Sequence, residues 1–122
     1  MRYITLILIL SCMVAPLPAQ EKTEEGPTNE KAKKTYKEGF GYLHRRMTDA
    51  ALESFKKADK QDGGHCLVCQ KKMIQYGVEL REWKTAEAAA AEMVEQSQDQ
   101  KDLAIAHYQL GIVLMDEGLD KH

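Results

Sequence analysis

The sequence lacks most of the patterns that mark an enzyme or a nucleic-acid-binding protein. Its 122 residues carry 17 basic and 19 acidic side chains, so the formal net charge of −2 offers no excess of basic charge for a nucleic acid. It contains no glycine-rich phosphate loop, no nucleophile placed beside a base and no carboxylates clustered for a metal. No stretch alternates apolar and polar residues for long enough to predict a β-strand. We therefore expect a helical protein without catalytic residues, metal or cofactor.

The first 19 residues match the pattern of a secretory signal peptide. Arg2 precedes an apolar run from Ile4 to Leu10, and the small residue Ala19 suits the position before a cleavage site. A membrane-spanning helix needs about 20 consecutive apolar residues, whereas this run is shorter and is followed by prolines. We expect cleavage after Ala19 and export of the protein to the periplasm, the cell envelope or the medium.

Two other fates of this segment stay open. The stretch from Ile9 to Cys12 looks like a bacterial lipobox, in which Cys12 would become the lipidated first residue, although Leu10 fits that motif poorly. An uncleaved membrane anchor is the second alternative. Residues 20–29 are polar around Gly26 and Pro27, and they are predicted to form a flexible linker.

From residue 30 onward the apolar residues recur at helical spacing. The first helix is predicted from near Glu30 to His44, and the second, capped by Thr48 or Asp49, ends at 61–64. Three more are predicted. One runs from His65 or Cys66 to Leu80, the next follows Trp83 and contains the alanine-rich stretch 86–91, and the last runs from about Gln100 to Glu117 between an Asp99 cap and Gly118. Charged residues of the second and fourth helices are expected to face solvent: Glu53, Lys56, Lys57, Glu87, Glu92 and Glu95.

A similar set of residues returns about every 35 positions along this helical part. The first set is Gly39, Tyr42, Ala51, Phe55 and Ala58; the second is Met73, Leu80, Trp83, Ala86, Ala90 and Met93; the third begins with Leu110, Gly111 and Leu114. Self-similarity at such a period is typical of stacked helix pairs, in which each unit buries its apolar face against its neighbours.

This pattern resembles the tetratricopeptide repeat family from about Ala32 to the end of the chain. The resemblance is best over the first set of residues, and it is looser in the second unit, where Ile74, Gly77 and Ala90 depart from the usual residue types. It implies an all-α fold of antiparallel helix pairs stacked as a short superhelical array of about two and a half repeats. The units would be 32–66, 67–103 and a partial 104–122 within a domain of residues 30–122. A generic helical bundle is the alternative.

In the proteins that this chain resembles, a peptide or protein partner lies in the concave groove lined by the first helix of each pair. The residues that this resemblance places in the groove include Lys33, Tyr36, Phe40, Lys71, Gln75, Tyr108 and Ile112. The expected function is therefore a non-enzymatic interaction module or scaffold. Only Lys33 and Lys71 supply positive charge to the expected groove, so capture of an acidic chain terminus is not predicted.

The last predicted helix carries apolar residues on nearly all sides, among them Ile105, Ile112, Leu114 and Met115. A helix of this kind is expected to be buried on all sides. Either another chain covers it, as in a dimer that shares the 104–117 helix, or further repeats follow His122. We favour the second interpretation.

Cys66 and Cys69 lie three residues apart at the predicted start of a helix. Their Cα atoms would be about 5 Å apart, within the range of a disulfide, and in an oxidising compartment they should pair. So short a loop removes little chain entropy, roughly 2 kcal/mol at most, which leaves room for a redox role. A redox-responsive pair, a metal ligand pair and a free dithiol stay open beside a plain local disulfide.

The alternative function follows from a second resemblance. The chain looks like the front part of exported proteins in which helical repeats precede a thioredoxin-like domain. Cys66 and Cys69 would then be a substrate, sensor or relay for thiol–disulfide exchange in the cell envelope. No membrane span is expected once the signal is removed.

Overall fold

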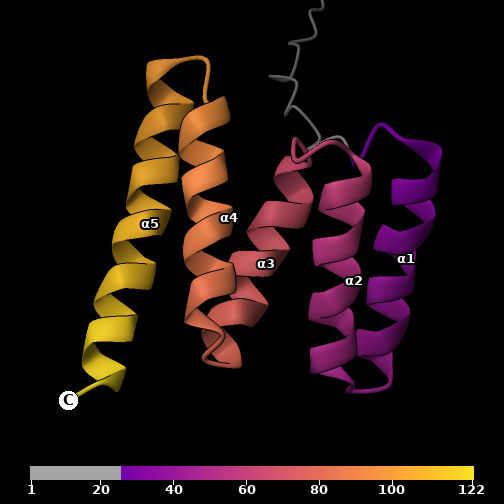
Figure 1. The fold of residues 1–122 in the computed structure, drawn as a ribbon, viewed down its shortest axis with the longest axis horizontal. Helices are drawn as coiled ribbons and strands as arrows, with labels where there is room; N and C mark the ends of the chain where they lie inside the picture. Colours follow the sequence, from indigo (N-terminus) through magenta and orange to yellow (C-terminus); the bar gives the residue numbers. More distant parts are fainter. Residues whose placement is uncertain (1–25) are drawn as a thin grey trace, which may run out of the picture.

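The computed structural model describes residues 26–122, which form five helices and no strand. The helices are α1 (Glu30–His44), α2 (Thr48–Gln61), α3 (Leu67–Glu79), α4 (Trp83–Gln96) and α5 (Gln100–Asp120). They stand side by side in chain order, and consecutive helices run in opposite directions (Figure 1). The predicted all-α fold of stacked antiparallel helix pairs is confirmed. No helix of this described part is long and apolar enough to cross a membrane.

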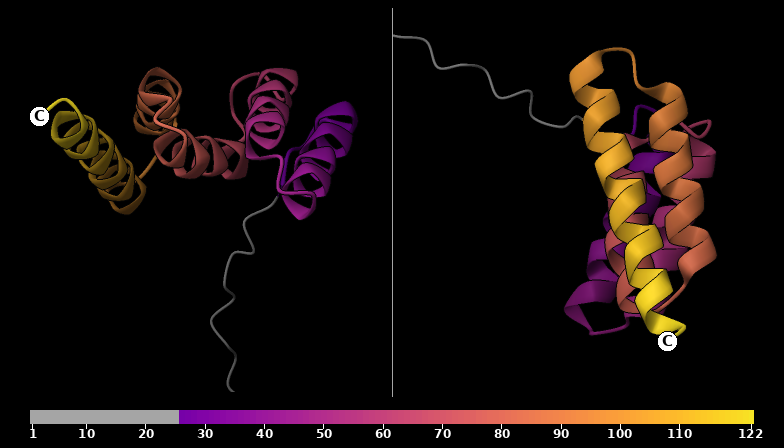
Figure 2. Two further views of the ribbon diagram at one scale, coloured as in Figure 1. Left: turned by 90° about the horizontal axis from the view of Figure 1, so that it is seen from below. Right: turned by 90° about the vertical axis from the view of Figure 1, so that its left-hand side faces the viewer.

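The helices form two rows when they are viewed along their axes. One row contains α1, α3 and α5, and the other contains α2 and α4 (Figure 2). Each helix packs against the next one in the chain, and α3 also contacts α5, its neighbour in the same row. The core lies between the rows and is built mainly of small and medium side chains; its buried members include Ala51, Phe55, Ile74, Ala90 and Val113.

The turns inside the two helix pairs repeat the same backbone geometry at a spacing of 35 residues. Arg46 and Arg81 both have φ of 59°, which is an uncommon conformation for residues with a side chain. The amide of the following residue then donates to a carbonyl five residues back: Met47 N to Tyr42 O at 2.9 Å and Glu82 N to Gly77 O at 2.7 Å. The period of about 35 residues in the sequence pattern is therefore also present in the backbone conformation of these turns.

The helix starts follow the sequence predictions in part. The Asn29 side chain accepts hydrogen bonds from the amides of Lys31 and Ala32, and Asp99 caps α5 as expected. Helix α2 differs, because its cap is Met47, which contributes no side-chain hydrogen bond. The repeated turn already determines where α2 begins, so neither Thr48 nor Asp49 serves as its cap.

Two predicted boundaries need correction. The linker prediction extended to residue 29, but Pro27 is buried, and Asp62 Oδ1 accepts hydrogen bonds from the amides of Thr28 and Asn29 and from the Thr28 hydroxyl at 2.9–3.0 Å. Gly118 does not end α5, which continues to Asp120. The last turn is held because Asp120 accepts a hydrogen bond from Trp83 Nε1 at 3.1 Å and pairs with Arg81 at 3.0 Å.

The closest approach between α1 and α2 occurs at Gly39. A Cβ atom placed on Gly39 would lie 2.6 Å from Cε1 of Phe55, whose side chain is fully buried. A Cβ atom placed on Gly41, also in α1, would have no atom within 4 Å apart from the adjacent backbone of α1 itself. The two glycines therefore offer a matched pair of substitutions.

We expect Gly39→Ala to destabilise the protein and Gly41→Ala to stabilise it. Overpacking a core costs about 1–3 kcal/mol, whereas replacing a helical glycine by alanine gains about 0.5–1 kcal/mol. Urea unfolding followed by circular dichroism measures both free energies of unfolding. Equal free energies for the two variants would show that the Phe55 ring is not held against Gly39.

Candidate functional site

The seven residues that the sequence assigns to partner binding all lie on the row of α1, α3 and α5. They are Lys33, Tyr36 and Phe40 on α1, Lys71 and Gln75 on α3, and Tyr108 and Ile112 on α5. Lys33, Gln75 and Tyr108 are exposed, and the other four are partly buried. The α1 residues line one groove together and Lys71 lines a second, whereas Gln75, Tyr108 and Ile112 line neither of these two.

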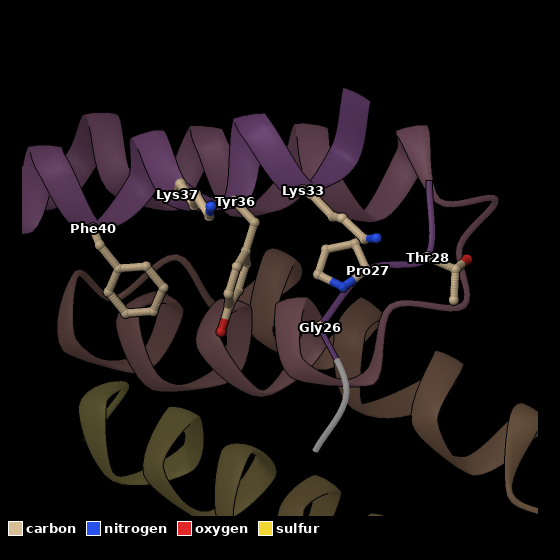
Figure 3. A pocket seen from close by; sticks show the side chains of 7 residues that line it. All are labelled: Gly26, Pro27, Thr28, Lys33, Tyr36, Lys37 and Phe40. Atoms are coloured by element: carbon tan, nitrogen blue, oxygen red, sulfur yellow. The ribbon is translucent and has the colours of Figure 1, made fainter. Parts of the chain in front are cut away.

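The first groove runs along α1 and has a volume of about 620 Å³ (Figure 3). It is lined by Gly26, Pro27, Thr28, Lys33, Tyr36, Lys37 and Phe40. Lys33 pairs with Glu30 at 2.9 Å, and the Nζ atom of Lys72 from α3 lies 5.6 Å from the centre of the Phe40 ring. Three lysines thus surround two aromatic rings. This end of the row is more basic than the sequence predicted, because Lys37 and Lys72 were not placed there.

Tyr36 and Phe40 are part of the core as well as of the groove. Their ring centres are 5.0 Å apart, and each lies 5.5 Å from the centre of the buried Phe55 ring. Burial also raises the pKa of the Tyr36 hydroxyl. Substituting either residue would disturb packing and a binding surface together, so neither is a clean probe of binding.

The second groove, of about 260 Å³, separates the start of α3 from the start of α5. Its lining includes Leu67 and Lys71 from α3 and Asp102 and Ile105 from α5, with the connection 97–99 at one end. Leu67 is 38% exposed and Ile105 is 40% exposed. The row therefore offers apolar surface at both of its ends.

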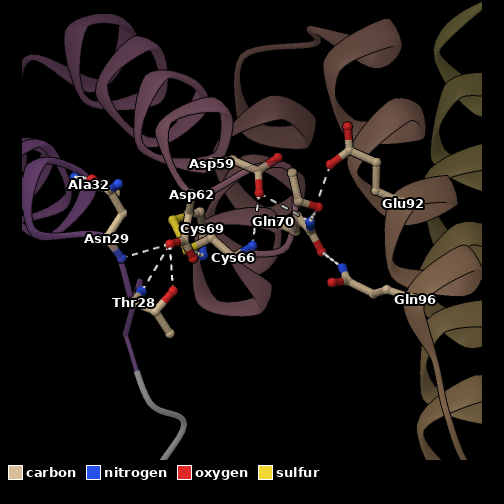
Figure 4. The surroundings of a disulfide bond; sticks show 11 residues. Thr28, Asn29, Ala32, Asp59, Asp62, Cys66, Cys69, Gln70, Glu92 and Gln96 are labelled. Carbon is tan, nitrogen blue, oxygen red and sulfur yellow. Dashed lines mark hydrogen bonds between the residues drawn. A yellow bond between two sulfur atoms is a disulfide. The ribbon is translucent and has the colours of Figure 1, made fainter.

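Cys66 and Cys69 form a disulfide at the start of α3, with their Cα atoms 5.2 Å apart (Figure 4). Cys66 is 2% exposed and Cys69 is 0% exposed. Helix α3 itself begins at Leu67, one or two residues later than predicted, and Cys66 is its cap. The Cys66 sulfur accepts a hydrogen bond from the Cys69 amide at 3.2 Å. The preceding turn places Gly63 and Gly64 at φ of 74° and 79°, where glycine is strongly favoured.

A network of polar side chains lies beside the disulfide and joins α2, α3 and α4 (Figure 4). Asp59 Oδ1 accepts hydrogen bonds from the Cys66 amide and from Gln70 Nε2, each at 3.1 Å. Gln70 Nε2 also donates to the Gly64 carbonyl and to Glu92 Oε2, and Gln96 donates to Gln70 Oε1. Asp59 and Gln70 are buried.

Glu92 corrects a sequence prediction, since it was expected on a solvated outer face. It is only partly exposed, and burial together with the nearby Asp59 carboxyl raises the pKa of Glu92 to about 7. Two carboxyl groups and two amides therefore meet where three helices come together. No signal in the sequence marks this cluster, because its members come from three different helices and form no motif.

The described residues contain no group of three or more His, Cys, Asp or Glu side chains that could hold a metal ion. Cys12 and the predicted signal peptide of residues 1–19 lie outside the described part of the chain.

Comparisons with known proteins give no assignment. A scan against family models finds no match, and searches of curated proteins and of solved structures find none either. Any function must therefore be argued from the residues themselves.

We expect the disulfide to resist mild reductants in the folded protein, because both cysteines are buried. After treatment with a reductant and a thiol-labelling reagent, mass spectrometry should detect no label under native conditions and two labels in denaturant. Cys66→Ser/Cys69→Ser should lower the free energy of unfolding by about 2 kcal/mol or less, since the closed loop is short. Rapid double labelling of the folded protein would contradict a buried bond.

We expect the stability of the protein to fall as pH rises from about 5 to 8. The folded state holds the Glu92 proton up to a pKa of about 7, whereas an unfolded glutamate loses it near 4.5. Stability that depends on this proton is present below pH 4.5 and is lost as pH rises through 7. Glu92→Gln should remove the slope and be more stable than the wild type at pH 8, by on the order of 1 kcal/mol after allowance for solvent screening.

Urea unfolding at pH 5, 6, 7 and 8 measures this difference, and Glu38→Gln, an exposed change on α1, is the control. If the wild type and Glu92→Gln have the same pH slope, the pairing of Glu92 with Asp59 is refuted.

Proposed function

We propose that this protein is a non-enzymatic interaction module that binds a peptide or protein along the row of α1, α3 and α5. The proposal keeps the tetratricopeptide-repeat interpretation of the sequence as its model of how the partner lies. Two grooves open on this row, and they combine apolar surface with lysine side chains. Aromatic and basic groups of this kind are common anchors at protein–protein interfaces.

The observation that carries the proposal is the exposure of large apolar side chains along α5. Tyr108 is 67% exposed, Leu119 is 70% exposed and Ile105 is 40% exposed. Neighbouring exposed apolar residues of this size are uncommon on a protein that works alone, and they mark interaction surfaces. Tyrosine is also among the residues that most often dominate binding energy.

The same proposal places the protein outside the cytoplasm. Its support is the signal-like pattern of residues 1–19 and the presence of a disulfide, a bond that persists in oxidising compartments. The redox alternative is supported by the position of the cysteine pair at a helix start, where thiolates are favoured. The burial of both cysteines argues against exchange with another protein unless the region opens.

We expect Tyr108→Ala to weaken partner binding by about tenfold or more, the loss typical of a tyrosine at the centre of an interface. The probe is a peptide selected from a displayed random library against the wild-type chain, and fluorescence anisotropy measures its dissociation constant. Tyr108 is the residue of choice because, unlike Tyr36 and Phe40, it does not pack on Phe55.

Met47→Ala is the matched control, since Met47 is 46% exposed and precedes α2 in the other row. It should leave the dissociation constant unchanged. A library that yields no binding peptide, or peptides that bind both variants equally, would count against the proposal.

A further inference from the structure

Helix α5 repeats one face of α1 at a spacing of 72 residues. Four residues of α1 have equivalents in α5, and the first three return unchanged: Ala32, Tyr36, Gly39 and Leu43. Their equivalents form what we call the outer α5 face: Ala104, Tyr108, Gly111 and Met115. Residues spaced by four, three and four positions lie along one side of a helix, so each set forms a continuous surface.

In α1, this surface is covered by α2, which runs in the opposite direction (Figure 1). The Phe55 ring lies over the backbone of Gly39, where an added Cβ atom would be 2.6 Å from Cε1 of the ring. Because the helices are antiparallel, three positions back along α1 correspond to three positions forward along α2. Tyr36 is therefore set against Ala58, which is fully buried. The α1–α2 contact thus places a large side chain against a small residue at successive positions.

In α5, the equivalent surface has no cover among the described residues. All four members of the outer α5 face are exposed, Tyr108 by 67% and Met115 by 60%. A Cβ atom placed on Gly111 would have no atom within 4 Å apart from the adjacent backbone of α5 itself. Ala106 and Val113 are buried in the core, and each lies two positions, or about 200°, from members of the outer α5 face. The face therefore points away from the array, at whose edge α5 stands (Figure 2).

The outer α5 face contains both halves of the α1–α2 contact. Gly111 is the equivalent of Gly39, which receives the Phe55 ring. Tyr108 is a large residue with small residues four positions before and three positions after it, which is the arrangement around Phe55 in α2. A two-fold axis through the middle of α5 would set Tyr108 of each copy over Gly111 of the other. Because an isologous contact requires a surface that is complementary to itself, this face fits a second copy of the chain.

The distribution of charge on α5 also suits a contact between identical chains. A two-fold axis brings side chains close to their own equivalents, so charged groups beside it would repel each other. The stretch from Leu103 to Met115 contains no Lys, Arg, Asp or Glu, although these residues make up 30% of the chain. The acidic residues of α5 lie outside this stretch: Asp102, Asp116, Glu117 and Asp120. The outer α5 face therefore gives a charged partner nothing to pair with, and it gives a second copy nothing that repels it.

We propose that two copies of this chain associate through their outer α5 faces, with the two α5 helices antiparallel. Tyr108 of each copy lies over Gly111 of the other, and Met115 lies against Ala104. This inference rests on the function proposed above, because it names a second copy as the partner of the exposed apolar side chains on α5.

Sedimentation equilibrium of the purified protein should show a monomer and a dimer in exchange. Tyr108→Lys and Gly111→Glu should each raise the dimer dissociation constant about tenfold or more, because each places a charge at the apolar centre of the contact. Both sites are exposed, so both variants should keep their fold, which far-UV circular dichroism verifies. Ala91→Lys, an exposed change on α4, is the matched control and should dimerise as the wild type does.

A mixture of the two variants tests the antiparallel register. In a mixed dimer, the lysine of Tyr108→Lys faces the glutamate of Gly111→Glu at one contact, and the other contact is that of the wild type. Opposite charges at the first contact attract, so the mixture should regain most of the dimer that each variant alone loses.

A dimer that neither variant weakens would overturn the proposal, as would a mixture that regains no dimer. A wild-type chain that sediments as a monomer would also overturn it, and would leave the outer α5 face to a different partner. The peptide assay described above keeps the two proposals apart. A monomer that binds a library peptide through Tyr108 refutes the dimer alone, whereas a dimer for which the library yields no peptide refutes peptide binding alone.

Discussion

The packing of the Phe55 ring is the contact on which the first half of the array depends. The ring belongs to α2, lies over Gly39 of α1, and stacks on Tyr76 of α3 with 6.0 Å between ring centres. One side chain of α2 thus contacts both α1 and α3, and it sets the distance between the axes of α1 and α2. The second half has no equivalent, because Ala90 occupies the corresponding place 35 residues later. There Gly77 meets Ala86 directly, with 3.2 Å between an added Cβ and the Ala86 Cβ.

This difference gives the polar network beside α3 its importance. Small side chains bury little apolar area, so the contacts between α2, α3 and α4 gain less from the hydrophobic effect than those around Phe55. The hydrogen bonds among Asp59, Gln70 and Glu92 cross all three helices and require their partners to be in register. Buried polar groups are costly when unpaired, so such a network penalises a shifted arrangement of α3 more strongly than an apolar contact would. Burial of the Glu92 carboxyl, together with its position beside Asp59, raises the pKa of Glu92.

The sequence predicted the helices well because their ends are marked locally. The first helix was predicted from near Glu30 to His44, in agreement with α1, and Asp99 was identified as a cap from its own type and position. It could not predict that α5 continues past Gly118, since that depends on contacts to Asp120 from Arg81 in the α3–α4 turn and from Trp83 of α4. For the same reason Glu92 was misplaced, because its partners come from two other helices. The residues assigned to the groove lie on α1, α3 and α5, and the contribution of Tyr36 and Phe40 to the core becomes visible only when Phe55 is in place.

The surroundings of Cys66 and Cys69 help to decide whether the pair is a structural disulfide or takes part in thiol–disulfide exchange. A helix start lowers the pKa of a thiol, and this effect alone would favour a reactive thiolate. Here the Asp59 carboxyl accepts a hydrogen bond from the Cys66 amide, so this amide of the helix start is already paired and is not available to a thiolate. Burial opposes it further, because a thiolate without solvent is costly. The same hydrogen bond links the disulfide to the network that joins α2, α3 and α4. A bond placed in this way fixes the start of α3, and thiol exchange at this site would first have to open the junction of three helices.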